Sequence, residues 1–196
     1  MRIGVDIDEV LAEFAPALME YHNATYGTSL SKRDITTYNL WEVWGGTREQ
    51  AVQKVRDFQA SEQFRSIQPV QGSQQATQQL RNNHELFVIT SRLEDFIPET
   101  KQWIAAHFPS TFSEMRVANY FSQQNPQRSK KDICDQLGVD LLIDDCFQYA
   151  AECVSPARQV LLMDAPWNQQ SSLPQGILRV HSWEDILARC HIICST

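Results

Sequence analysis

Residues 1–14 read MRIGVDIDEVLAEF, and the expected fold follows from this stretch. Residues 2–7 are a short apolar run with β-branched members, which is typical of a buried strand. Asp6 and Asp8 lie at the carboxyl end of this run, and a third acid, Glu9, follows directly. So much negative charge at the end of a buried strand indicates a turn, a metal site or a nucleophile.

Four further apolar runs predict strands, and helical patterns lie between them. The strands are expected over residues 85–90, 115–119, 140–144 and 158–163, and the helices over residues 95–107, 130–137 and 146–154. A last helix is expected to begin at Ser182, because the Ser-x-x-Asp pattern through Asp185 is typical of a helix amino terminus. Strands that alternate with helices predict an α/β fold with a Rossmann-like parallel sheet and helices on both faces.

One segment interrupts this alternation between the first two strands. It is much longer than a single crossover helix requires. We interpret residues 14–72 as a small inserted helical cap on a core made of residues 1–13 and 73–196. Helical periodicity in this part of the chain is clearest over residues 15–25, 47–60 and 73–82. The aromatic sequence TTYNLWEVWGG, residues 36–46, is expected to form a loop.

The composition narrows the expected partners and location. The formal net charge of −7 argues against nucleic-acid polymers and anionic membranes, because both require a basic face. A small phosphorylated substrate remains compatible, since a metal ion and a lysine can meet its charge locally. The sequence contains no signal-peptide pattern and no membrane-spanning apolar run. Five cysteines without a framework spacing predict reduced thiols and a cytoplasmic location, whereas the sequence leaves open whether the chain forms a homodimer.

Polar residues follow several of the expected strands, and in an open parallel sheet ligands bind beyond the carboxyl ends of the strands. A single aspartate at such a position is usually a turn former. A set of carboxylates from separate strands repels itself unless a hard divalent cation lies among the oxygens, and Mg²⁺ suits such a site. The strand-end residues are Asp6, Asp8, Thr90, Ser91, Arg92, Asp144, Asp145 and Asp164.

Four short motifs give these strand ends a family resemblance. DIDEV at residues 6–10, VITSR at 88–92, a lysine that opens a helix and LLIDD at 141–145 resemble the motif series of the haloacid dehalogenase superfamily. The second aspartate of DIDEV is typical of its phosphatase branch. A closer similarity is to the 5'(3')-deoxyribonucleotidase group, and it is carried by DIDEVLAEF, by FRSIQPVQGSQQATQQL at 64–80 and by DAPWN at 164–168. Residues 20–60 match that group only loosely.

The resemblance implies a role for each acid. Asp6 would be the nucleophile that forms an aspartyl-phosphate, and Asp8 would be the general acid that later activates water. Mg²⁺ would be held by the Asp6 carboxylate, the Asp8 backbone carbonyl and the Asp144–Asp145 pair. Within that pair we favour Asp145 as the direct ligand and Asp144 as its neighbour.

The remaining motifs supply candidate phosphate ligands. Thr90, with the backbone of Ser91, would hydrogen-bond the phosphoryl oxygens, or its hydroxyl could cap the next helix. Arg92 has two readings, since it could reach the phosphate or pair with Glu94 or Asp95.

Two adjacent lysines, Lys130 and Lys131, open the helix before LLIDD. One of them would neutralise the phosphate and the nucleophile. Counting back from the expected helix end at Gly138 favours Lys130, and the other lysine is expected to be a solvated surface charge.

Aromatic residues gather at the ends of the inserted segment, and a nucleobase over a phosphate site would be gripped by such rings. Phe14 is the first candidate, because the nucleotidase resemblance has a base-stacking aromatic there. Trp41 and Trp44 come next, whereas Tyr38 and Phe64 are expected to form the small core of the cap.

These observations predict a Mg²⁺-dependent phosphomonoester hydrolase, specifically a 5'-nucleotidase for (deoxy)nucleoside monophosphates. The alternatives are a phosphatase for another small metabolite, such as a sugar phosphate, and a catalytically silent binding protein of the same fold. The complete acid set argues against the silent protein, which would not need Asp8. Glu9 departs from the group, where glycine is usual; it could alter the loop or point to solvent.

Overall fold

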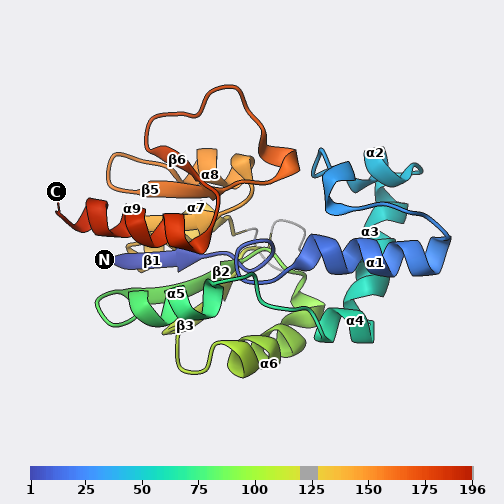
Figure 1. The fold of residues 1–196 in the computed structure, drawn as a ribbon, viewed down its shortest axis with the longest axis horizontal. Coiled ribbons are helices and arrows are strands. Elements are labelled where there is room, and N and C mark those ends of the chain that lie inside the picture. Colours follow the sequence, from blue (N-terminus) through green and yellow to red (C-terminus); the bar gives the residue numbers. More distant parts are fainter. Residues whose placement is uncertain (120–127, 196) are drawn as a thin grey trace.

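A six-stranded parallel sheet forms the centre of the molecule (Figure 1). The computed structural model describes residues 1–119 and 128–195, and its strands have the order β3-β2-β1-β4-β5-β6. Each pair of neighbouring strands runs parallel, which confirms the expected α/β fold. The strands are β1 (Arg2–Val5), β2 (Glu85–Thr90), β3 (Glu114–Val117), β4 (Leu141–Asp144), β5 (Gln159–Met163) and β6 (Ile177–Val180).

The sequence predicted five of these strands and missed β6. With the sequence ILRV, β6 is a four-residue strand at the edge of the sheet, where β5 is its one neighbour among the described strands, and it includes a charged residue, Arg179. A run this short and partly polar has no clear strand signal, because pairing with a neighbour supplies most of its stability.

The helices follow the expected pattern with one correction. The aromatic sequence at residues 36–46 is not all loop, because Leu40–Trp44 forms the short helix α2. The longer helices are α1 (Phe14–Tyr26), α3 (Arg48–Gln59), α5 (Ser73–Leu80), α6 (Ile97–His107), α7 (Lys130–Leu137), α8 (Phe147–Cys153) and α9 (Trp183–Ser195). The shorter ones are α2, α4 (Glu62–Arg65) and the 3₁₀ turns η1 (Lys32–Asp34), η2 (Glu94–Phe96) and η3 (Pro166–Asn168).

Two apolar layers cover the faces of the sheet. Alternate strand residues point to opposite faces, so that Leu141 and Ile143 of β4 belong to one layer and Leu142 to the other. Helices α7 and α8 contribute to the layer that contains Leu142, whereas α5, α6 and α9 contribute to the opposite layer. The central strands are therefore buried on both sides, which leaves their carboxyl ends as the place where polar side chains gather.

The segment from α1 to α4, which we call the α1–α4 segment, lies between β1 and β2 in the chain. Figure 1 shows these helices grouped at one end of the sheet, on the side toward which β1 runs. The chain enters and leaves through two adjacent antiparallel stretches, where Glu13 donates a backbone hydrogen bond to Gln68 (2.9 Å) and Val70 donates one to Leu11 (2.8 Å). Two adjacent, hydrogen-bonded stretches of chain thus join the segment to the sheet. Within the described residues, no helix has the length and apolar character needed to cross a membrane.

Candidate active site

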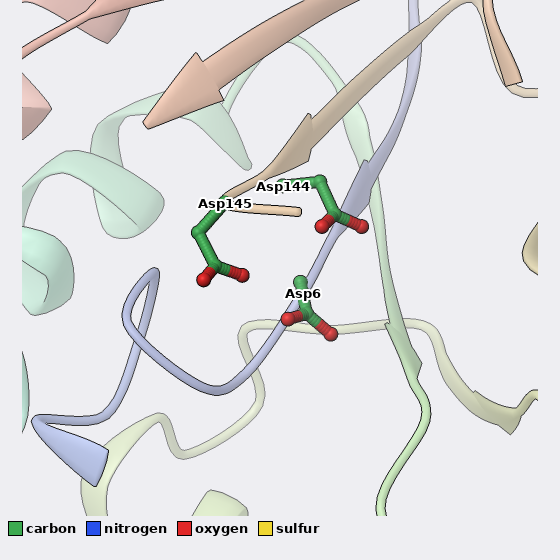
Figure 2. Close-up of side chains that lie close together, drawn as sticks. All are labelled: Asp6, Asp144 and Asp145. Carbon is green, nitrogen blue, oxygen red and sulfur yellow. The ribbon is translucent and has the colours of Figure 1, made fainter. Parts of the chain in front are cut away.

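Asp6 and Asp144 lie side by side because their strands are neighbours. Val5 of β1 is opposite Ile143 of β4, and Asp6 extends this pairing by donating a backbone hydrogen bond to the Ile143 carbonyl (2.9 Å). Asp144 ends β4 and Asp145 follows it. The three aspartates form an acid cluster in which one oxygen of each lies within 4.8 Å of the others (Figure 2). All three are buried.

Lys130 supplies the positive charge of this cluster. It is the first residue of α7, it is only 1% exposed, and its ammonium lies 2.8 Å from Asp6 and 2.7 Å from Asp144. Lys131 is exposed and pairs with Asp135 on the same helix. The structure therefore brings Lys130, and not Lys131, to the acids. The buried ammonium leaves the cluster with more carboxylates than cations.

Burial and mutual repulsion make the charged form of these acids costly. Burial raises the pKa of Asp6 to about 7, although Lys130 opposes the shift. Burial and the neighbouring Asp144 and Asp6 carboxylates raise the pKa of Asp145 well above its ordinary value. Burial alone would lower the pKa of Lys130, but the adjacent carboxylates outweigh it and raise that pKa well above its usual range. A further cation among the oxygens would favour the ionised acids, and three carboxylates are a donor set that suits Mg²⁺.

Arg92 pairs with Asp8. The roles expected for it were to bind phosphate or to pair with an acid of the next turn, and neither role included this contact. Its buried guanidinium donates from Nη2 and Nε to Asp8 Oδ1, at 2.5 and 3.0 Å, and from Nε to Oδ2 at 3.2 Å. Nη1 also donates to the Thr100 hydroxyl (3.3 Å), whereas Asp95 pairs with Arg56 (2.6 Å). A charge-assisted fork of this kind fixes the orientation of a carboxylate.

Thr90 and Ser91 lie at the carboxyl end of the sheet, as the acids do. Thr90 ends β2, the neighbour of β1 on the side away from β4, and it is buried. Its hydroxyl accepts a hydrogen bond from the backbone of Arg92 (3.1 Å). The turn after β2 thus holds a hydroxyl and backbone amides beside the end of β1.

Glu9 is buried, so of the two alternatives considered for it, the one in which it points to solvent is wrong. Its φ of 63° lies in the left-handed region, which is uncommon for residues other than glycine. Its carboxylate accepts a hydrogen bond from the backbone of Ala15 (2.5 Å) and forms an ion pair with Lys32. Burial raises the pKa of Glu9, and Lys32 opposes this effect. Glu9 therefore ties the turn after β1 to the start of α1 and to η1.

Tyr38 contacts the acid cluster, so the expectation that it belongs to the core of the cap is wrong. Its hydroxyl donates a hydrogen bond to Asp145 Oδ2 (2.6 Å), although the residue as a whole is 44% exposed. Burial of the hydroxyl and the nearby Asp145 raise the pKa of Tyr38 well above its ordinary value, which keeps it a donor at neutral pH. Trp167 donates to the same oxygen from its indole nitrogen (2.8 Å). The sequence motif DAPWN contains Trp167 but assigned it no role, and nothing near Tyr38 in the chain signals its contact.

The three aromatic candidates for base binding lie in different surroundings. Phe14 is half-buried and packs edge-on against Phe58 (5.3 Å between centroids) and Phe64 (6.4 Å), and Phe64 belongs to the buried core as expected. Trp44 stacks on the His22 ring of α1 (4.6 Å). Trp41 is half-buried on α2.

Known proteins resemble this chain along nearly its full length. Residues 1–193 match the family model described as "5' nucleotidase, deoxy (Pyrimidine), cytosolic type C protein". The chain belongs to this family. The 5'(3')-deoxyribonucleotidase of Bacillus subtilis is 23% identical over 189 residues, which cover 94% of this chain and 95% of that protein. Membership makes the protein a phosphomonoester hydrolase of the haloacid dehalogenase type, and the hypothesis of a silent binding protein is set aside.

Solved structures agree with this fold. A haloacid dehalogenase-like hydrolase from Streptococcus pneumoniae superimposes with a TM-score of 0.71 at 15% identity, covering 96% of this chain and 97% of that one. The Bacillus subtilis protein YfnB, solved bound to magnesium, superimposes with a TM-score of 0.57 at 12% identity, covering 96% of this chain and 97% of that one.

Proposed function

We propose that the protein is a Mg²⁺-dependent 5'-nucleotidase that hydrolyses (deoxy)nucleoside monophosphates through an aspartyl-phosphate on Asp6. One observation carries the proposal: in a chain of the nucleotidase family, four charged residues converge at the carboxyl end of the sheet. They are Asp6, Asp144, Asp145 and Lys130. The named activity of the Bacillus subtilis relative supports the choice of nucleotides.

Mg²⁺ would be held by Asp6, Asp145 and the backbone carbonyl of Asp8. Asp144 is the weaker candidate for direct ligation, because both of its oxygens already accept hydrogen bonds, Oδ2 from Lys130 (2.7 Å) and Oδ1 from the backbone of Cys146 (2.9 Å). When bound, the ion would neutralise phosphate charge and orient the ester for in-line attack. A magnesium-bound structure of the same fold supports this choice of metal.

Asp6 would attack phosphorus with a carboxylate oxygen, and the ester bond to the leaving oxygen would break. Lys130, at 2.8 Å from Asp6, favours the ionised nucleophile and would also attract the phosphate. In the second step water would attack the same phosphorus, and the Asp6 carboxylate would leave.

Asp8 would move the proton in both steps, first to the leaving alkoxide and then from the attacking water. The Arg92 fork holds its carboxylate by both oxygens, and the Asp8 side chain keeps 28% exposure, so a substrate group can reach it. Arg92 would thus be a positioning residue for Asp8. Thr90 and the backbone of Ser91 would bind the phosphoryl oxygens.

Residues 14–72 would act as a cap that contributes to the substrate pocket. Phe14 is the best candidate for stacking on a base, because it begins α1 just beyond the turn that contains Asp6 and Asp8. Trp41 and Trp44 are weaker candidates. Cys134, Cys146 and Cys153 are buried and form no disulfide, which supports the expected reducing, cytoplasmic environment.

The test is phosphate release from a panel of nucleoside 5'-monophosphates and sugar phosphates, with and without Mg²⁺. We expect a preference for nucleotides, dependence on Mg²⁺, and a loss of at least about 10³-fold in Asp6→Asn. The matched control is Asp57→Asn, at an exposed position on α3. Equal rates on sugar phosphates would contradict the nucleotide assignment, and an active Asp6→Asn would contradict the nucleophile.

A further inference from the structure

Asp145 receives two hydrogen bonds on one oxygen, from residues of two separate parts of the chain. Tyr38 and Trp167 both donate to Oδ2, at 2.6 and 2.8 Å, and their rings meet edge-on with 5.8 Å between centroids. A carboxylate has a second oxygen with its own lone pairs. Two donors on Oδ2 hold the carboxylate in one orientation and leave Oδ1 to face a different partner.

The two donors differ in how firmly they are held. Trp167 precedes Asn168, a buried residue whose amide donates to the carbonyls of Asp145 and Met163, both at 2.7 Å. Arg179 fixes Asn168 from the other side (2.5 Å). The η3 turn that carries the Trp167 indole is therefore fixed to the carboxyl end of the sheet.

Tyr38 reaches Asp145 from the α1–α4 segment, 107 positions earlier in the chain. Tyr38 is 44% exposed, and the same part of the segment also forms the Lys32–Glu9 ion pair. The Lys32 ammonium also lies 5.7 Å from the centre of the Trp167 ring. The Tyr38 hydroxyl thus connects the segment to a proposed metal ligand, and this hydrogen bond forms only when the segment lies against the acid cluster.

We propose that Tyr38 is a positioning residue for Asp145, which couples the placement of residues 31–38 to cation affinity at the acid cluster. With the segment docked, Tyr38 and Trp167 together hold Asp145 so that Oδ1 is presented to the cation. Without the phenol, repulsion from Asp6 and Asp144 is free to turn the Asp145 carboxylate. The inference rests on the proposed magnesium site.

The experiment is titration calorimetry of Mg²⁺ alone, without substrate, on wild type, Tyr38→Phe and Tyr26→Phe. Tyr26 is a matched control, because it is similarly exposed (41%) and also lies in the α1–α4 segment, where its ring contacts His22. Phe at position 38 keeps the ring against Trp167 and removes only the hydroxyl. We expect Tyr38→Phe to weaken Mg²⁺ binding about tenfold, as loss of a hydrogen bond to a metal ligand typically does. Tyr26→Phe should bind as wild type does.

Thermal unfolding of the metal-free proteins separates positioning from folding. The melting temperatures of wild type and Tyr38→Phe should agree within about 2 °C, and saturating Mg²⁺ should restore kcat in the variant. Unchanged Mg²⁺ affinity in Tyr38→Phe would overturn the positioning role alone. Failure of the wild type to bind Mg²⁺ would instead overturn the proposed metal site, and the inference with it.

Discussion

The acid cluster and the α1–α4 segment meet at Asp145, but they contribute to the site in different ways. The sheet side provides Asp6, Asp144 and Lys130, whose side chains are buried and fixed by strand register and by the start of α7. The segment provides long side chains from partly exposed residues, Tyr38 and Lys32. The charge balance of the cluster is thus part of the folded sheet domain, whereas the segment contacts it from outside. Substitutions on the sheet side should therefore affect stability first, and those on the segment side should affect binding.

The largest expected effect is that of Lys130→Met. Removing one partner from a buried ion pair leaves an uncompensated charge, so we expect the free energy of unfolding to fall by about 3–5 kcal/mol in the metal-free protein. Chemical denaturation at neutral pH measures it. Lys131→Met is the matched control, because its ion pair with Asp135 is exposed to solvent and its loss should leave the free energy of unfolding nearly unchanged. Similar losses in the two variants would show that Lys130 is not the counter-charge of the cluster.

Arg92→Lys should have the next largest effect, on the rate of turnover. Lysine keeps the charge but loses the fork that holds Asp8, so we expect kcat to fall about tenfold, with KM changed less than about twofold. Steady-state kinetics at saturating Mg²⁺ measure both constants. Arg56→Lys, in the exposed pair with Asp95, should behave as wild type. A rise in KM at constant kcat would indicate that Arg92 binds phosphate directly.

Stabilisation by Mg²⁺ should depend on pH because of Asp6. Its pKa in the fold is about 7, above the ordinary value of 3.8, so its contribution to stability is present below pH 3.8 and is lost as pH rises through 7. A cation compensates the ionised form, so the rise in melting temperature caused by Mg²⁺ should be larger at pH about 8 than at pH about 5. Thermal unfolding across this range measures the effect, and Asp6→Asn should reduce its pH dependence. An equal Mg²⁺ effect at both pH values would exclude Asp6 as a ligand.

The smallest expected effect is on KM, and it should differ between two aromatic residues of the α1–α4 segment, Phe14 and Trp44. Phe14→Leu should raise KM for a nucleoside monophosphate by about twofold to tenfold, the range that one aromatic contact supplies. Trp44→Leu should leave KM within about twofold of wild type, because Trp44 stacks on His22. The readout is KM for a nucleotide and for a sugar phosphate. A larger effect of Trp44→Leu would place the base near α2.

Local sequence pattern was enough to predict five of the six strands and the acids at their carboxyl ends. Parallel strands bring their carboxyl ends together, so a pattern of apolar runs that end in DID, TSR and DD is enough to gather Asp6, Thr90 and Asp145. Helix periodicity also singled out Lys130, because its place in the first turn of α7 follows from the helix end at Gly138. The positions of these residues in the fold follow from local pattern and from one topological rule, whereas their chemical roles stay predictions.

Contacts between side chains that are far apart in the chain became visible in the folded structure alone. Arg92 lies 84 positions from Asp8, and Tyr38 lies 107 positions from Asp145. Such contacts depend on the path of the inserted chain and on the direction of each side chain, and neither leaves a periodic signal. For the same reason the burial of Glu9 against Lys32 could not be read from the sequence, since an acid in a turn is ordinarily solvated and here a lysine of the inserted segment covers it.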